Sequence, residues 1–188
     1  MTLLTVWADD DPSSVLSRTT DGEQIARELK PLGVRFERWP LAGDLPAEPT
    51  PQEVLAAYAP HVRRVIDTEG YVLVDAMSMS PSGDPERAAE ARRKFLAEHT
   101  HDDDEDRFFA RGAGAFYLHI GGKVYAVLCE AGDMLSVPAD TPHWFDMGSR
   151  PDYVAIRFFH QEDGWVGDFT GSRLAEALPD FDTLFAAR

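Results

Sequence analysis

The spacing of hydrophobic and polar positions changes near residue 96 of this chain. Upstream, apolar positions either recur at helical spacing or alternate at strand spacing, which is typical of mixed α and β structure. Helices are predicted over 21–29, 50–66 and 84–96, and strands over 2–8, 34–39 and 71–78. Thr50, Pro51 and Glu53 form a capping-box pattern with proline at the first helical position, and therefore predict a helix start.

Downstream, short apolar segments follow one another with turn residues between them. Strands are predicted over 108–114, 115–122, 123–133, 134–142, 143–148 and 152–160, and a short helix over 172–178. Gly121 and Gly122 separate two alternating segments and predict a two-residue hairpin turn. Strands at this regular spacing indicate a β-sandwich or β-barrel.

Length and charge narrow the choice of function. The chain of 188 residues is most simply one domain, with a mixed α/β N-terminal part (1–95), a β-rich core (96–160) and a C-terminal segment (161–188). Its 33 acidic residues exceed its 18 basic residues and give a net charge of −15. Nucleic acid and anionic membranes would be repelled, so neither is expected as a partner.

The compartment is predicted from the single cysteine and the N-terminus. Cys129 lies in an apolar segment, where a small buried hydrophobic residue is expected, and one cysteine allows no intramolecular disulfide. The first residues lack the basic start and apolar run of a signal peptide, and no segment has the apolar length of a membrane span. We expect a cytoplasmic protein.

Candidate chemistry concentrates in the segment EHTHDDDEDRFF, residues 98–109. In an extended segment His99 and His101 would point to the same face, so both could reach one metal ion. Glu105 follows His101 by four residues, which is enough for a bend to return a carboxylate to the same point. Histidines on a solvated acidic loop are the alternative, because this spacing of histidines is unspecific by itself.

A second module supports a metal site. Gly132 predicts a turn, Pro138 the end of a strand, and His143 the start of the next strand. This order would bring His143 back beside the first two histidines.

The two modules resemble the two motifs of the cupin superfamily. HTHDDDEDRFFARG has the spacing H-x-H-x3-E-x6-G, and GDMLSVPADTPH resembles G-x5-P-x-G-x2-H. Arg93, Asp140 and Met147 depart from the usual motif residues, whereas the four metal-ligand positions are intact: His99, His101, Glu105 and His143. The resemblance implies a mainly β fold, a double-stranded β-helix (jelly-roll) barrel with flanking α-helices, in which 96–160 form the metal-binding core.

A narrower resemblance, to the bacterial acireductone dioxygenase family, covers roughly residues 94–171. It is carried by KFLAEHTHDDDEDRFF, FYLHIG, VLCEAGDMLSVPADTPHWFDMG and GWVGDFTG. It implies a methionine-salvage enzyme that cleaves 1,2-dihydroxy-3-keto-5-methylthiopentene with O2, and a monomer. Fe2+ would give 4-methylthio-2-oxobutanoate and formate, and Ni2+ would give methylthiopropionate, formate and carbon monoxide. Co2+ and Mn2+ also suit a site of imidazoles and one carboxylate.

The family resemblance assigns roles to further residues. Arg107 would favour the doubly deprotonated substrate, with a salt bridge to a neighbouring acid as the alternative. Glu98 would assist metal entry and Asp104 would link the site to the surrounding loop, although each is equally well read as a solvated acid. The expected pocket walls, for which core packing is the alternative, are Phe95, Phe145 and Trp165.

Three other readings of the site fit less well. A structural zinc site usually needs thiolates, and no cysteine lies nearby. A 2-oxoglutarate oxygenase would need a basic residue about ten positions after its distal histidine, where this chain has Tyr153 or Thr170. A non-catalytic cupin that binds a small molecule would not need Arg107 beside the ligands. The remaining histidines, His61, His119 and His160, match no ligand position.

Overall fold

Two antiparallel sheets share one long strand in the computed structural model of this protein, which describes residues 1–43, 45–161 and 165–188. One sheet has the order β11-β5-β9-β6-β7-β1-β2, and the other has the order β4-β10-β6-β8-β3. The first contains β11 (Asp168–Phe169), β5 (His99–Thr100), β9 (His143–Asp146), β6 (Glu105–Ile120), β7 (Lys123–Glu130), β1 (Leu3–Ala8) and β2 (Asp11–Thr19). The second adds β4 (Leu73–Met79), β10 (Tyr153–Phe159), β8 (Asp133–Val137) and β3 (Arg35–Arg38). Gly164, the first residue of the matched segment GWVGDFTG, lies outside the described residues.

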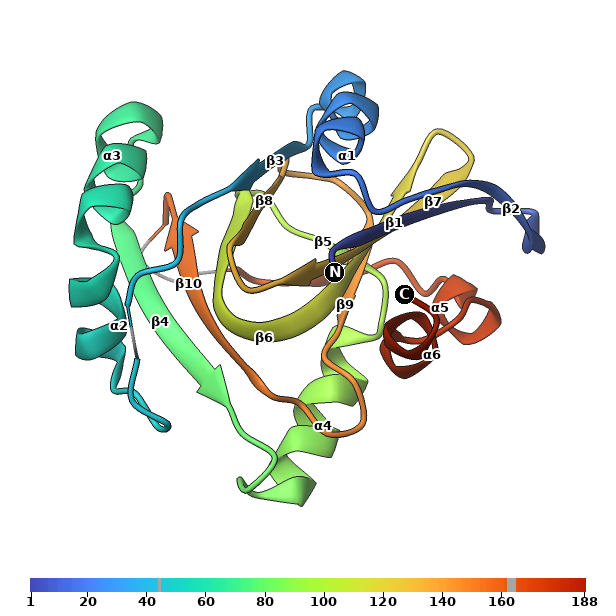
Figure 1. The fold of residues 1–188 in the computed structure, drawn as a ribbon. Helices are drawn as coiled ribbons and strands as arrows, with labels where there is room; N and C mark the ends of the chain where they lie inside the picture. The colour runs from blue at the N-terminus through green and yellow to red at the C-terminus, as the bar shows by residue number, and fades with distance from the viewer. Residues whose placement is uncertain (44, 162–164) are drawn as a thin grey trace.

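The shared strand β6 bends from one sheet into the other and curves through the centre of the molecule (Figure 1). Its first half pairs with β8 and β10, and its second half pairs with β7 and β9. Gly112 has a φ of +72°, and a Cβ there would lie 1.9 Å from the carbonyl oxygen of Asp152. The prediction of separate strands at 108–114 and 115–122 is therefore wrong, because the glycines bend the chain without reversing it.

Six α-helices and one 3-10 helix of the described residues surround the sheets. They are α1 (Gly22–Leu29), η1 (Lys30–Leu32), α2 (Pro51–Ala57), α3 (Ala59–Glu69), α4 (Pro85–Phe95), α5 (Leu174–Ala177) and α6 (Phe181–Ala186). Helices α2 and α3 run along the outer side of β4 (Figure 1). The single helix predicted over 50–66 is divided at Tyr58, because Pro60 has no N–H to continue the helical hydrogen bonds.

Strand β2 and helix α6 were not predicted from the sequence. The side chains of β2 are mostly exposed, so its edge position imposes no clear alternation of apolar and polar residues. Helix α6 is six residues long, and its Asp180 cap accepts a hydrogen bond from the backbone of Thr183. Among the described residues, no helix combines the length and apolar character needed to cross a membrane.

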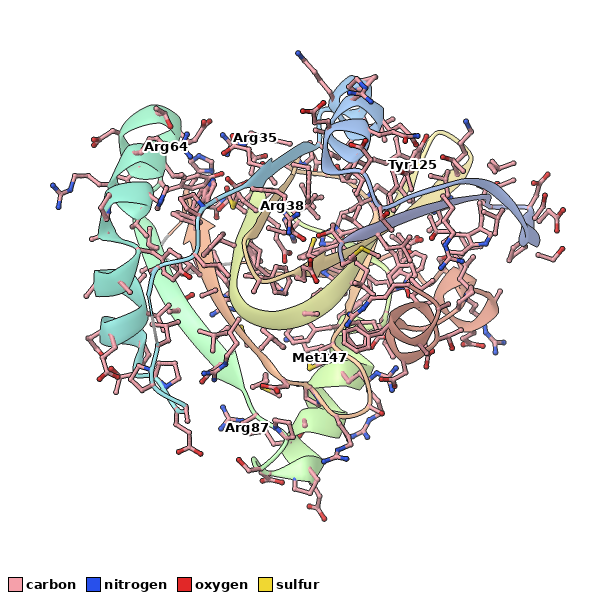
Figure 2. All side chains as sticks on the ribbon, in the orientation of Figure 1. Arg35, Arg38, Arg64, Arg87, Tyr125 and Met147 are labelled. Atoms are coloured by element: carbon pink, nitrogen blue, oxygen red, sulfur yellow. The ribbon has the colours of Figure 1, made fainter. Side chains whose placement is uncertain are left out.

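The mainly β prediction is confirmed, and the core lies between the two sheets. Its members include Phe109, Phe116 and Phe145, which are all buried. Arg35 lies on β3 (Figure 2). It pairs with Glu69 at the end of α3 and with the buried Asp106 of β6. These contacts fix the start of β6, where the candidate site begins.

Candidate metal centre

The structure brings together the four residues predicted to bind metal. His99 lies on β5 and faces His143 on β9 as its pairing partner, while Glu105 opens β6. The Oε2 atom of Glu105 lies 3.1 Å from Nε2 of His101 and 3.3 Å from Nε2 of His143. Donor nitrogens of the three histidines lie within 4.8 Å of one another, which is close enough to bind one ion.

The tautomers of the histidines also suit a metal ion. Each Nδ1 pairs with a backbone carbonyl oxygen: that of Ala97 for His99 (2.8 Å), Asp103 for His101 (2.6 Å) and Thr141 for His143 (2.7 Å). A proton held on Nδ1 leaves Nε2 with its lone pair free to bind metal, as is usual for metal-binding histidines. Three imidazoles and a carboxylate therefore fit a divalent transition-metal ion.

Charge in the site is balanced by Arg107. Burial opposes ionisation of Glu105, but the Arg107 guanidinium holds the pKa of that carboxyl well below its usual range. Burial lowers the pKa of His99, and the nearby His143 also contributes to this shift. His99 therefore favours the neutral form that a metal ion requires.

Arg107 forms the salt bridge that was the alternative reading, and its role toward the substrate stays a prediction. It lies two residues after Glu105 on the same face of β6, and its Nη2 donates to Oε1 of Glu105 at 2.6 Å. Its guanidinium lies over the rings of Phe116, Phe145 and Trp165. Its buried Nε has no hydrogen-bond partner among the described residues.

A cavity of about 350 Å³ adjoins these groups. The three aromatic residues expected to form its walls, Phe95, Phe145 and Trp165, all line it. Leu73 and Phe169 also line it and are partly exposed to solvent, so they mark its opening. Its size, and its mixture of aromatic and charged lining residues, suit a small molecule with both apolar and polar parts.

The two acids assigned accessory roles lie in different places. The buried carboxylate of Glu98 accepts from Oγ1 of Thr170 (2.6 Å) and pairs with Nδ1 of His119 (3.0 Å), and Glu98 does not line the cavity. Asp104 joins the loops around the site, because its carboxylate accepts from Ala139 N and its carbonyl oxygen accepts from Trp165 Nε1. Both functional roles stay predictions.

Several cavity residues were missed by sequence reasoning. Arg157 on β10 pairs directly across from Arg107 on β6, so both side chains lie on one face of the sheet. Its guanidinium donates to both carboxylate oxygens of Asp75. An arginine at an alternating position in the apolar segment YVAIRFF was the available signal. The other missed residues are Leu73, Asp75, Lys94, Phe159, Gly167 and Phe169.

The histidines outside the motifs lie away from the cavity lining. His61 stacks on Trp39, with ring centroids 5.2 Å apart. His119 bridges Glu98 and Asp9. His160 pairs with the carboxylate of Asp103.

Known proteins resemble this chain over most of its length. The model of the ARD/ARD' family matches residues 5–167. An acireductone dioxygenase of Saccharopolyspora erythraea is 61% identical over 100% of both chains, and one of Frankia alni is 55% identical over 98% of this chain and 91% of the relative. A solved structure, an acireductone dioxygenase from Bacillus anthracis with a cadmium ion in its active centre, has a TM-score of 0.76 at 29% identity and covers 90% of this chain and 98% of its own.

The two-sheet fold and the histidine cluster define a cupin, and the cadmium-bearing relative supports a metal site in it. The chain belongs to the ARD/ARD' family, the acireductone dioxygenases, and is thereby an oxidoreductase.

Proposed function

We propose that His99, His101, Glu105 and His143 bind one divalent ion, Fe2+ or Ni2+, and that this centre cleaves acireductone with O2. The observation that carries the proposal is the convergence of the Glu105 carboxylate and the histidine Nε2 atoms beside an aromatic cavity. A divalent ion held there would supply Lewis acidity and a template for two substrate oxygens.

The chain's own groups would prepare the substrate. Arg107 is buried and charged and lines the cavity, so its guanidinium would favour the enediolate over the enediol. Phe95, Phe145 and Trp165 would hold the methylthio tail and keep water away from the reacting carbons. With Arg107 charged, the developing negative charge would be balanced inside the cavity.

The products would depend on the ion. In our proposal the Fe2+ protein yields 4-methylthio-2-oxobutanoate and formate for methionine salvage, and the Ni2+ protein yields methylthiopropionate, formate and carbon monoxide. Stripped protein should be loaded with each ion separately, supplied with acireductone and O2, and its products identified. Substrate loss no faster than the non-enzymatic oxidation in both forms would exclude this reaction. It would leave another metal-dependent cupin oxygenase, or a non-catalytic cupin that binds a small molecule.

The ligand set can be tested by two variants with the same change of charge. Glu105→Gln removes a proposed ligand, whereas Asp102→Asn alters an exposed acid of the same acidic run. We expect Asp102→Asn to retain about one Ni2+ per chain and Glu105→Gln to lose most of it, as read by elemental analysis after desalting. Equal metal content in the two variants would remove Glu105 from the proposal.

We also propose a cytoplasmic monomer. The buried, free Cys129 suits a reducing compartment, and the resemblance to bacterial family members favours a single chain. Light scattering coupled to size exclusion would test the monomer, and fractionation of the cells would test the compartment.

A further inference from the structure

The orientation of His101 depends on a short turn. His101 lies beyond the end of β5, in the turn that leads to β6, and its Nδ1 pairs with the carbonyl oxygen of Asp103 in the same turn. No strand pairing holds residues 101–104. The His101 ring also stacks on Trp165, and the His101 carbonyl oxygen accepts from the N–H of Asp140. The contacts that hold this turn therefore contribute to the orientation of the imidazole.

The carboxylate of Asp103 supplies such contacts, although it points away from the metal centre. It is 4% exposed, its Oδ2 accepts from the backbone N–H of His160 at 2.8 Å, and its Oδ1 pairs with Nδ1 of His160 at 2.6 Å. Oδ1 also accepts from the N–H of Asp104. A buried carboxylate is costly unless it is paired in this way, so the pair is strongly held.

His160 connects this carboxylate to the helical side of the molecule. It follows β10, its ring lies 4.1 Å from that of Tyr71, and its Nε2 donates to the carbonyl oxygen of Glu69 at 3.2 Å. With an acceptor at each ring nitrogen, His160 suits the imidazolium form. Burial alone would lower the pKa of His160, but the hydrogen bond to Asp103 raises it above its ordinary value.

We propose that Asp103 and His160 are positioning residues for the metal centre: they fix the turn whose carbonyl oxygen orients His101. The inference rests on the proposed metal site. Neither residue lines the cavity, so neither is placed to contact the substrate. A group hydrogen-bonded directly to a metal ligand typically changes metal affinity by about 10–100-fold when it is removed. The Asp103 carboxylate and His160 act one step further out, so we expect an effect at the lower end of this range.

The test measures metal binding itself. His160→Phe keeps a ring beside Tyr71 but removes both side-chain donors, and Asp103→Asn keeps the shape of the side chain but removes its charge. Each stripped variant is titrated with Co2+ against a chelating indicator, and the visible absorption of bound Co2+ reports the ligand geometry. We expect both variants to bind Co2+ at least about tenfold more weakly than the parent protein, with an altered spectrum.

Two further variants test the link between the residues. Because Asp103 and His160 act through the same turn, the affinity of the double variant for Co2+ should be no lower than that of the single variant with the lower affinity. His160→Gln restores a side-chain donor toward Asp103, so its affinity should lie between those of the parent protein and His160→Phe. Independent losses that multiply in the double variant would contradict a shared path.

Asp133→Asn is the matched control. Asp133 is a buried carboxylate that accepts from Glu130 N and pairs with Arg38, and it lies outside the candidate site. We expect this variant to unfold at a lower temperature but to bind Co2+ as the parent protein does. If the folded His160→Phe and Asp103→Asn variants behave in the same way, the pair is merely structural and the inference is wrong. A parent protein that binds no Co2+ would instead overturn the metal site, and this inference with it.

Discussion

At the scale of single residues, we propose two roles for Arg107: it holds Glu105, and it stabilises the charge of the substrate. One nitrogen donates to Glu105, while Nε remains without a partner among the described residues. Lysine would keep the charge but lose the planar set of donors. We therefore expect Arg107→Lys to retain Ni2+ while kcat/KM for acireductone falls about 100-fold, measured in the metal-loaded variant.

The control for this prediction is metal content, determined on the same sample as the rate. Loss of Ni2+ in parallel with activity would show that Arg107 acts mainly by holding Glu105. An unchanged kcat/KM would exclude a role for its second donor.

Asp140, a departure from the cupin motif, lies in the left-handed region. Its φ is +61°, and its N–H donates to the carbonyl oxygen of His101. It lies in a turn in which the N–H of Thr141 donates to the carbonyl oxygen of Pro138. Aspartate tolerates this conformation better than alanine, and glycine adopts it without strain. Asp140→Ala should therefore be less stable than Asp140→Gly by about 1 kcal/mol in urea unfolding. Equal stability of the two variants would show that the turn relaxes to another conformation.

At the scale of elements, the bend of β6 joins two halves of one strand. One half carries Glu105 and pairs with β8 in the second sheet, and the other half pairs with β9 in the first. An added Cβ at Gly112 meets backbone atoms of Asp152, whereas one at Gly121, with a φ of +60°, meets nothing within 4 Å. Gly121→Ala should cost about 1 kcal/mol from conformation alone, and Gly112→Ala about 3 kcal/mol, by chemical denaturation. A similar cost at both positions would mean that β6 can straighten.

Elements and site residues could be predicted from the sequence where residues close in the chain determine them. His99, His101 and Glu105 are close in sequence, and His143 follows a predicted turn and strand. Their spacing therefore indicated that they lie near one another. Arg157 was missed because its place opposite Arg107 comes from the pairing of β10 with β6, which no local pattern encodes. The bend in β6 was missed for a related reason: a glycine that bends a strand and one that ends it look alike until the neighbouring strands are known.

At the scale of the whole molecule, the proposed ligands come from both sheets. His99 and His143 lie on strands of the first sheet, whereas Glu105 lies in the half of β6 that pairs with β8 in the second. A bound ion would therefore connect the two layers around the core. Since unfolding separates these ligands, the ion should bind the folded chain alone and stabilise it by mass action.

Ni2+ should accordingly raise the unfolding temperature of the stripped protein. At a concentration about 100-fold above the dissociation constant the gain is about 2.7 kcal/mol, which for a chain of this size corresponds to roughly 5–10 °C. Mg2+ prefers oxygen ligands and should give no comparable shift, because three of the four proposed ligands are imidazoles. Calorimetry of the parent protein and of Glu105→Gln tests whether this gain comes from the proposed site. The rise in unfolding temperature with Ni2+ should nearly vanish in the variant. An equal shift in both proteins would place the stabilising ion elsewhere, and the two sheets would then not be joined through Glu105.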